Sequence, residues 1–349
     1  MPVTSLVIVC ATLFGADAAP SPNGQSSAAA APLNAHETII RSLKFLQDDV
    51  VKWRKEHECA TCHHGTLTVW VLSEARERGF AVKPETLAEI AKWTKAGVLA
   101  RIDLPRDARP GWSVVSTPAL YLAAMARSVP SQTAVSPADL KQIAGHLLRH
   151  QEADGSWSWA SAPAKNRAPP VFESDEVATL LALDALGTSL PGDPMEKSAI
   201  RIARAQGAAW LKQASPHDTT QAAALRLVAQ VWDGPSVDTT SPVDKVQTEI
   251  ESLIRRANSD GGWPQIPGAR SDAYATGQAL YILSLAGEKH DRIEMRRGVQ
   301  FLVGTQRDDG SWLMTRRGHP GVTPTKEMVP ITYFGSVWGT LGLLRATQK

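Results

Sequence analysis

A repeat of about fifty residues constrains the fold of this chain more than any other feature of its sequence. Three segments contain an Asp-Gly turn followed closely by tryptophan: 151–159 (QEADGSWSW), 258–265 (NSDGGWPQ) and 306–314 (QRDDGSWLM). Trp210 continues the spacing in a degraded form, so that Trp157, Trp210, Trp263 and Trp312 stand 53, 53 and 49 residues apart. A period of this length indicates one supersecondary unit that recurs along the chain.

Each repeat predicts a pair of helices. A polar amphipathic helix precedes the turn, as in 244–257, and a more apolar helix rich in Ala and Leu follows it, as in 272–287. The second kind is apolar most of the way round, so we expect it to be buried on nearly all sides. Capping residues stand just ahead of the apolar helices, namely Ser174, Asp218 and Ser271.

Extending the pattern in both directions predicts six helical hairpins. The expected outer helices are 37–55, 85–99, 137–151, 195–213, 243–257 and 291–306, and the expected inner helices are 66–78, 116–128, 174–187, 218–232, 272–287 and 331–346. No run alternates as a strand, and the apolar helix always comes second. The pattern therefore predicts an all-α fold, an α/α toroid over 36–349 in which six inner helices form a barrel within an outer ring.

The turn residues have structural roles in such a fold. Glycine permits the positive φ of a tight turn, and glutamine can hydrogen-bond the turn backbone from the end of the outer helix. Tryptophan would pack on the neighbouring outer helix and join adjacent hairpins. We therefore do not assign these residues to catalysis.

The N-terminal segment predicts export. An apolar run followed by small residues indicates a signal peptide over 1–19, and 20–35 has the Pro, Ser, Gly and Ala content of a flexible leader. The apolar run is too short to span a bilayer, so no integral membrane span is expected after signal removal. The exported chain would be periplasmic or extracellular and would retain two cysteines, Cys59 and Cys62.

The segment EHECATCHHG at 56–65 matches the attachment pattern of c-type haem. Cys59 and Cys62 would bind the porphyrin, and His63 would ligate the iron. The same residues with His64 could instead hold zinc, and the two cysteines could form a disulfide or a redox pair. These alternatives stay open. The candidates for a second iron ligand are His217 first, then His319 and Met314.

The tryptophan turns resemble the QW repeats of the triterpene cyclase and protein prenyltransferase superfamily, and the squalene-hopene cyclase type is the best match. The resemblance covers most of 137–347 well and 37–128 more weakly. It implies an acidic motif at the start of an inner helix, where this chain has Glu173, Asp175 and Glu176, with Asp175 as the proton donor of an isomerase. The alternative is that these acidic residues cap a helix and complement its dipole.

In a toroid all inner helices begin at the same end of the barrel, where their positive helix ends form a natural binding mouth. Tyr333 and Phe334 would line this mouth or pack in the core, whereas His146 and His150 are expected on a solvated helix face. The residues expected at the mouth are His63, His64, Asp175, His217, Asp218 and Asp272.

Charge excludes one class of partner. The chain has 37 basic and 35 acidic side chains, a net charge of +2, which gives no reason to expect nucleic acid as a partner.

Three functions are consistent with the sequence. The first is an exported terpene-cyclase-like toroid that binds a small apolar or polymeric ligand and carries haem c, with a redox partner. The second is a single-toroid isoprenoid cyclase that uses Asp175, and the third is a polysaccharide lyase or hydrolase. Whether the chain is an enzyme is left open.

Overall fold

The computed structural model describes residues 34–57, 62–102, 116–132, 134–158, 173–188, 193–233, 242–314 and 329–347. The segment from Asn34 to Lys349 is one compact unit. The expected signal peptide and nearly all of the expected leader lie outside the described residues.

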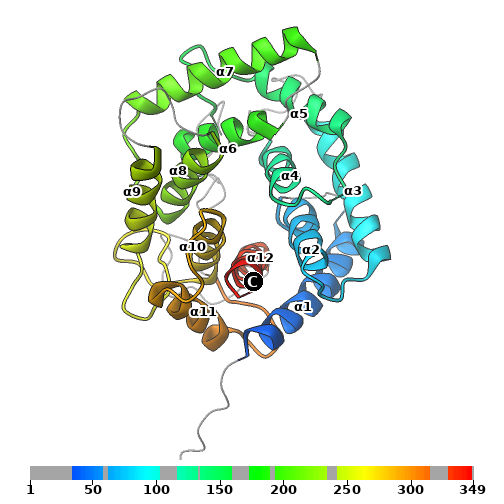
Figure 1. Cartoon of the computed structure of the whole chain (residues 1–349). Helices are drawn as coiled ribbons and strands as arrows, with labels where there is room; N and C mark the ends of the chain where they lie inside the picture. The colour runs from blue at the N-terminus through cyan, green and yellow to red at the C-terminus, as the bar shows by residue number, and fades with distance from the viewer. Residues whose placement is uncertain are drawn as a thin grey trace, which may run out of the picture. The chain divides into compact units, whose positions relative to one another are not determined.

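The helices of this unit confirm the α/α toroid, with six helices around a barrel of six (Figure 1). The outer helices are α1 (Ala35–Glu56), α3 (Pro84–Ile102), α5 (Pro137–Arg149), α7 (Pro194–Gln213), α9 (Pro242–Ile254) and α11 (Ile293–Thr305). The inner helices are α2 (Thr68–Glu77), α4 (Thr117–Ser128), α6 (Asp175–Thr188), α8 (Thr220–Asp233), α10 (Ala273–Leu285) and α12 (Val329–Ala346). A π-helical turn, Cys62–Leu67, leads into α2. The described residues contain no β-strand, only an isolated bridge between Pro264 and Ser271.

The inner helices run parallel, because hydrogen bonds join residues from the C-terminal halves of all six. We call this end of the barrel the C-terminal rim and the opposite end the N-terminal rim. The bonded residues are Glu74 (α2), Arg127 and Ser128 (α4), Asp184 (α6), Trp232 (α8), Tyr281 (α10) and Arg345 (α12).

The tryptophan turn joins each hairpin to the next. Gln151 donates from Nε2 both to the carbonyl oxygen of Gly155 in its own turn (2.9 Å) and to that of Ala203 in α7 (2.8 Å). Trp157 is fully buried, and its Nε1 donates to the carbonyl oxygen of Leu147 near the end of α5 (2.9 Å). The ring of Trp157 also lies against Gly207 in α7, so the roles expected for the glutamine and the tryptophan are confirmed. Trp263 and Trp312 bond in the same way to Leu253 and Leu302.

Trp210 does not belong to this series, and that part of the repeat prediction was wrong. It lies within α7, and its Nε1 donates to Oδ2 of Asp154 in the preceding turn (3.1 Å). The spacing of 53 residues therefore reflects a tryptophan that supports its neighbour's turn and does not form one of its own.

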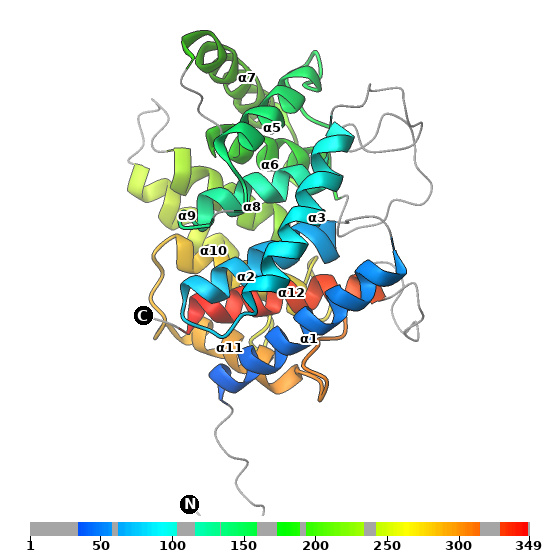
Figure 2. The same ribbon diagram turned by 90° about the vertical axis from the view of Figure 1, so that its right-hand side faces the viewer.

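The last tryptophan turn closes the ring on the first helix. Gln306 donates from Nε2 to the carbonyl oxygen of Thr38 in α1 (2.9 Å), as Gln151 does to α7. Gly310 has a φ of +87°, and a Cβ atom there would lie 2.4 Å from the carbonyl oxygen of Arg41. Only glycine fits this contact without displacing backbone. Figure 2 shows α1 and α12 beside each other at the closure.

His146 and His150 are buried rather than solvated, contrary to the expectation from sequence. His146 is 5% exposed, its Nδ1 lies 3.1 Å from the carbonyl oxygen of Ile102, and its Nε2 accepts from the backbone of Ser116. Ile102 at the end of α3 and Ser116 just before α4 thus contact His146 near the end of α5. Burial lowers the pKa of His146 to about 3, and the nearby His150 contributes to the decrease.

Closure predicts that Gly310→Ala destabilises the protein far more than Gly268→Ala. Gly268 also has a positive φ, +76°, but no atom lies within 4 Å of a Cβ atom placed there. We expect a loss of about 1 kcal/mol for Gly268→Ala from φ alone and at least ~3 kcal/mol for Gly310→Ala. Urea unfolding of both variants measures the difference, and equal losses would contradict the closure described above.

The low pKa of His146 predicts acid sensitivity. The folded state holds this imidazole neutral, so its contribution to stability is complete above the unfolded pKa of about 6.5 and is lost as the pH falls toward 3. Lowering the pH from 7.5 to 4.5 should cost about 2–3 kcal/mol through this residue. His146→Gln should reduce the pH dependence of urea unfolding by that amount, and the same change at exposed His36 should not.

Candidate functional site

Aromatic side chains from four inner helices meet inside the barrel, and we call this cluster the aromatic lumen. Each of the six is at most 5% exposed, and their ring centroids lie 5.3–6.5 Å apart. Such tilted and edge-on pairs are favourable beyond their burial. The six are Trp70 (α2), Tyr121 (α4), Tyr274 and Tyr281 (α10), and Phe334 and Trp338 (α12).

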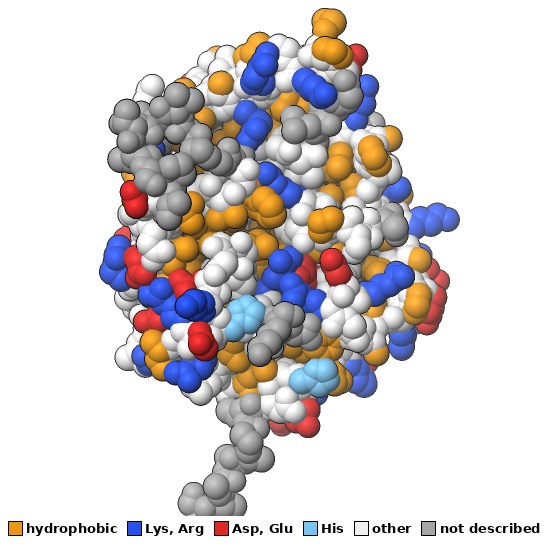
Figure 3. All heavy atoms as spheres, in the orientation of Figure 1, with side chains coloured by type: hydrophobic (Ala, Val, Ile, Leu, Met, Phe, Trp, Pro, Cys, Tyr) orange, Lys and Arg blue, Asp and Glu red, His pale blue; other side chains and the backbone are white. Residues whose placement is uncertain are grey.

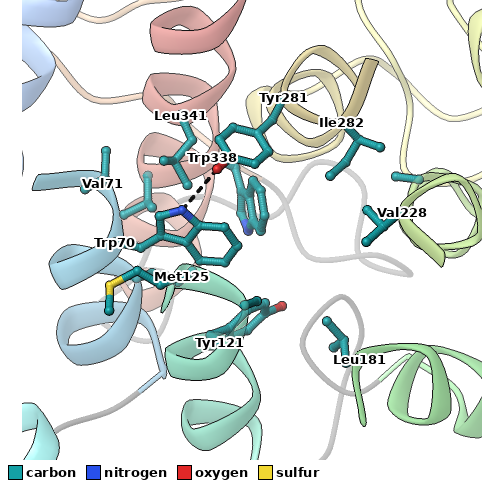
Figure 4. Packing of buried hydrophobic residues seen from close by; sticks show 14 of the residues in the cluster. Trp70, Val71, Tyr121, Met125, Leu181, Val228, Tyr281, Ile282, Trp338 and Leu341 are labelled. Carbon is teal, nitrogen blue, oxygen red and sulfur yellow. Dashed lines mark hydrogen bonds between the residues drawn. The ribbon is translucent and has the colours of Figure 1, made fainter. Parts of the chain in front are cut away.

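A cavity lies between these rings and the C-terminal rim. About 40 Å³ of it is open to the centres of water molecules, more than one water needs. Leu181, Val228 and Ile282 form apolar walls around the space that the Tyr121 hydroxyl group enters (Figure 4). On the face of the molecule at the C-terminal rim, apolar side chains gather near the middle (Figure 3). The sequence favoured a binding mouth at the N-terminal rim, whereas this cavity lies toward the other rim.

Two polar atoms of the cavity residues have no hydrogen-bond partner. They are Oε1 of Gln278 and Nε1 of Trp338, and both side chains are at most 5% exposed. A buried polar atom without a partner costs free energy in the folded state. One acceptor and one donor are therefore left on two of the residues that line the cavity.

A polar network closes the lumen on the side of α2 and α12. Tyr281 donates to Oε2 of Glu74 (3.2 Å) and accepts from Nε1 of Trp70 (3.2 Å). Arg345 pairs with Glu74 at 2.6 Å. Burial raises the pKa of Tyr281, and the negative charge of Glu74 adds to the increase. The phenol is therefore a neutral part of the lumen wall at physiological pH.

At the N-terminal rim, Asp49, His64 and His63 form a hydrogen-bonded chain. Oδ2 of Asp49 lies 2.8 Å from Nε2 of His64, and Nδ1 of His64 lies 2.5 Å from Nδ1 of His63. Burial lowers the pKa of His63 well below 6.5, and His64 and His57 add to the decrease. Burial also lowers the pKa of His64, although Asp49 acts in the opposite direction. Both imidazoles are therefore neutral near pH 7.

Aromatic rings hold this chain in place. His64 is fully buried between Trp53 (centroids 4.2 Å apart, planes at 7°) and Tyr333 (3.7 Å, 26°). His57 stacks on the other face of Trp53 at 3.6 Å. His63 meets Phe334 edge-on at 6.5 Å, so the chain adjoins the aromatic lumen at its N-terminal end.

The acidic residues expected from the cyclase motif have different surroundings. Asp175 is exposed in the first turn of α6, and Glu173 is half-buried just before it. Glu176 is 6% exposed and lies 2.6 Å from Nη1 of Arg226 in α8, and it also accepts the backbone N–H of His217 (2.6 Å). The ion pair joins α6 to the middle of α8, and the hydrogen bond joins it to the segment just before α8, so Glu176 has a structural role.

The other residues expected at the mouth are spread around the N-terminal rim. Asp218 is exposed and pairs with Arg256 (2.5 Å), and Asp272 caps α10 by accepting the N–H of Ala275 (2.8 Å). His217 is exposed at the start of α8, across the ring from α2, so the structure does not bring it to His63 (Figure 1).

Cys59 and the side chain of Cys62 lie outside the described residues, as does His319. Met314 is fully buried against Gly335. The described part of the chain contains no group of three or more His, Cys, Asp or Glu residues arranged to hold a metal ion. In the same part, every helix is too short or too polar to cross a lipid bilayer.

Known proteins resemble this chain in structure but not detectably in sequence. No protein-family model matches it, and no curated protein matches it. Unsaturated glucuronyl hydrolase from Bacillus sp. GL1, described as responsible for the degradation of glycosaminoglycan, is similar with a TM-score of 0.60 at 15% identity, over 90% of this chain and 97% of that one.

Two further solved structures share the fold. Type II terpene cyclase MstE from Scytonema, in complex with geranylgeranyl dihydroxybenzoate, is similar with a TM-score of 0.52 at 14% identity, over 89% of this chain and 97% of that one. A possible member of the GH105 family from Klebsiella pneumoniae has a TM-score of 0.57 at 12% identity, over 89% and 93%. These likenesses establish the toroid fold and leave the function to be argued from the site.

Proposed function

We propose that this chain is an exported, terpene-cyclase-like toroid that binds a small apolar molecule in its aromatic lumen. The cavity bordered by Trp70, Tyr121, Tyr281 and Trp338 is the observation that carries the proposal. Its rings and aliphatic walls favour an apolar ligand by burial and by stacking. The unpartnered Oε1 of Gln278 and Nε1 of Trp338 favour a ligand that also bears a hydroxyl or carbonyl group.

Cavity filling tests this proposal. Farnesol, an apolar alcohol, should quench the tryptophan fluorescence of the protein, and Val228→Trp should weaken binding at least ~10-fold by occupying the cavity. The control is Ile202→Trp, because Ile202 is 56% exposed on an outer helix. Equal affinity in both variants, or no binding of the alcohol to the wild type, would remove the lumen as the site.

At the level of the fold, the structural neighbours support two enzymatic alternatives equally: isoprenoid cyclisation and cleavage of a polysaccharide. For the first, the sequence offers Asp175 as the proton donor. Both can be examined with the same preparation. Turnover of a polyprenoid that is lost in Asp175→Asn would favour the cyclase, and release of sugar from an acidic polysaccharide would favour the hydrolase. Binding of the alcohol without turnover supports the ligand-binding function proposed above.

The proposal includes a c-type haem attached at Cys59 and Cys62, with His63 as iron ligand. It is supported by the spacing of the motif and by the neutral imidazole of His63, whose Nδ1 is engaged by His64. When bound, the haem would supply a one-electron redox centre, and a redox partner would then be required. Export over 1–19 would deliver the chain to the compartment in which such haems are attached.

Covalent haem has a direct signature. The chain expressed with haem-maturation genes should show a Soret band that persists after denaturation, and Cys59→Ala with Cys62→Ala should abolish it. A colourless wild type that contains zinc would favour the metal alternative. A colourless wild type without free thiols would favour the disulfide.

A further inference from the structure

We propose that Gln278 selects the ligand of the aromatic lumen, and that this ligand is an uncharged, acyclic alcohol whose hydroxyl group lies at the inner end of the cavity. The inference rests on the proposed function and names the ligand class of that same site. It is carried by the unpaired amide of Gln278, by the charges of the cavity walls and by the shape of the open space.

Gln278 lies at the inner end of the cavity. Four residues of α10 line the space, namely Gln278, Tyr281, Ile282 and Leu285. Their spacing of three and four residues puts them on one face of the helix. Because α10 ends at Leu285 on the C-terminal rim, Gln278 lies about 10 Å deeper in the barrel. Figure 4 shows Tyr281 and Ile282 extending from α10 toward the interior of the barrel.

The amide of Gln278 is buried and unpaired. The side chain is 3% exposed, and its Oε1 has no hydrogen-bond partner. None of the hydrogen bonds among the described residues involves this amide, so rotation about its last torsion can present either the oxygen or the nitrogen to the cavity. Gln221 of α8, which also lines the cavity, accepts instead from the hydroxyl group of Tyr274 (2.9 Å).

A hydroxyl group is the best match for such an amide. It can donate to Oε1 of Gln278, and it can accept from Nε2 of the same amide or from the unpartnered Nε1 of Trp338. An ether or aldehyde oxygen can only accept, so it would leave Oε1 of Gln278 unpaired in a buried site, which costs free energy. The amide therefore favours an alcohol over an ether or a carbonyl compound of the same size.

The cavity walls disfavour a carboxylate. None of the described residues that line the cavity is Lys, Arg or His, and the charged residue among them is Asp184. Its carboxylate pairs with Arg127 (2.9 Å) at the C-terminal rim. A carboxylate bound beside Gln278 would therefore be buried without a cation, and this burial costs more than that of a neutral hydroxyl group.

The open space has the shape of a single hydrocarbon chain. The part open to the centres of water molecules, about 40 Å³, holds about three waters. The residues that line it extend over about 10 Å of α10, from Gln278 to Leu285. The space is therefore long and narrow, and the rings of Trp70 and Tyr121 border it. It admits an acyclic chain more readily than a ring of the same number of carbon atoms.

A matched set of small ligands tests the inference on the full chain, with tryptophan fluorescence as the measurement. We expect n-decanol to bind roughly tenfold more tightly than decyl methyl ether, decanoate or cyclodecanol. Gln278→Met keeps the length of the side chain and removes the amide, so the preference for the alcohol over the ether should disappear. The control is Gln47→Met, which should keep this preference. Gln47 is a buried glutamine of α1, outside the cavity, whose amide bonds to Leu43 and Lys83.

Stability without ligand gives a second measurement. Gln278→Met removes an unpaired buried amide, so it should lower the ratio of unfolded to folded protein roughly fivefold in urea unfolding. Gln47→Met removes an amide with two partners and should raise this ratio. A loss of stability in both variants would contradict an unpaired Gln278.

The outcomes separate this inference from the proposed function. A wild type that binds neither farnesol nor n-decanol overturns the proposed function. Binding of n-decanol that Val228→Trp weakens, with the same ratio of alcohol to ether affinity in the wild type and Gln278→Met, overturns the role of Gln278 alone. Equally tight binding of decanoate or cyclodecanol overturns the ligand class. If Gln278→Met fails to fold, equal affinity of the wild type for the alcohol and the ether contradicts the inference.

Discussion

The contact between each tryptophan turn and the next outer helix is the constraint on which the remaining structure depends. Gln151 bridges its own turn and α7, and Gln306 bridges its own turn and α1, so a short polar connection fixes the distance between neighbouring hairpins. Glycine at the turn allows the backbones to approach, and buried tryptophan satisfies a carbonyl group at the end of the outer helix. Repetition of this joint turns a row of hairpins into a ring.

A closed ring of parallel inner helices has two chemically different ends. At the C-terminal rim, Arg127 and Arg345 bind helix-end carbonyl groups and the carboxylates of Asp184 and Glu74, so cations complement the negative ends of the helices. At the N-terminal rim, the hydrogen-bonded chain of Asp49, His64 and His63 adjoins the lumen through Phe334.

The sequence predicted the helices and the toroid because the tryptophan turns and the apolar second helix of each pair are local signals. It did not reveal the lumen, because the inner helices are apolar on nearly all sides and no face is distinguished. The spacing of Tyr274 to Tyr281 and of Phe334 to Trp338 was the only available sign. The burial of His146 and the ion pair of Glu176 were not predicted for another reason: their partners, Ile102 and Arg226, lie about fifty residues away in sequence.

The hydroxyl groups of Ser42 and Thr340 meet at 2.5 Å where α1 and α12 come together, 298 residues apart in sequence. Because the last inner helix, α12, borders the first, α2, the interior of the barrel is incomplete until almost the whole chain has been released from the ribosome. Contact between the first and last hairpins forms late, so the apolar inner helices remain exposed to solvent during synthesis.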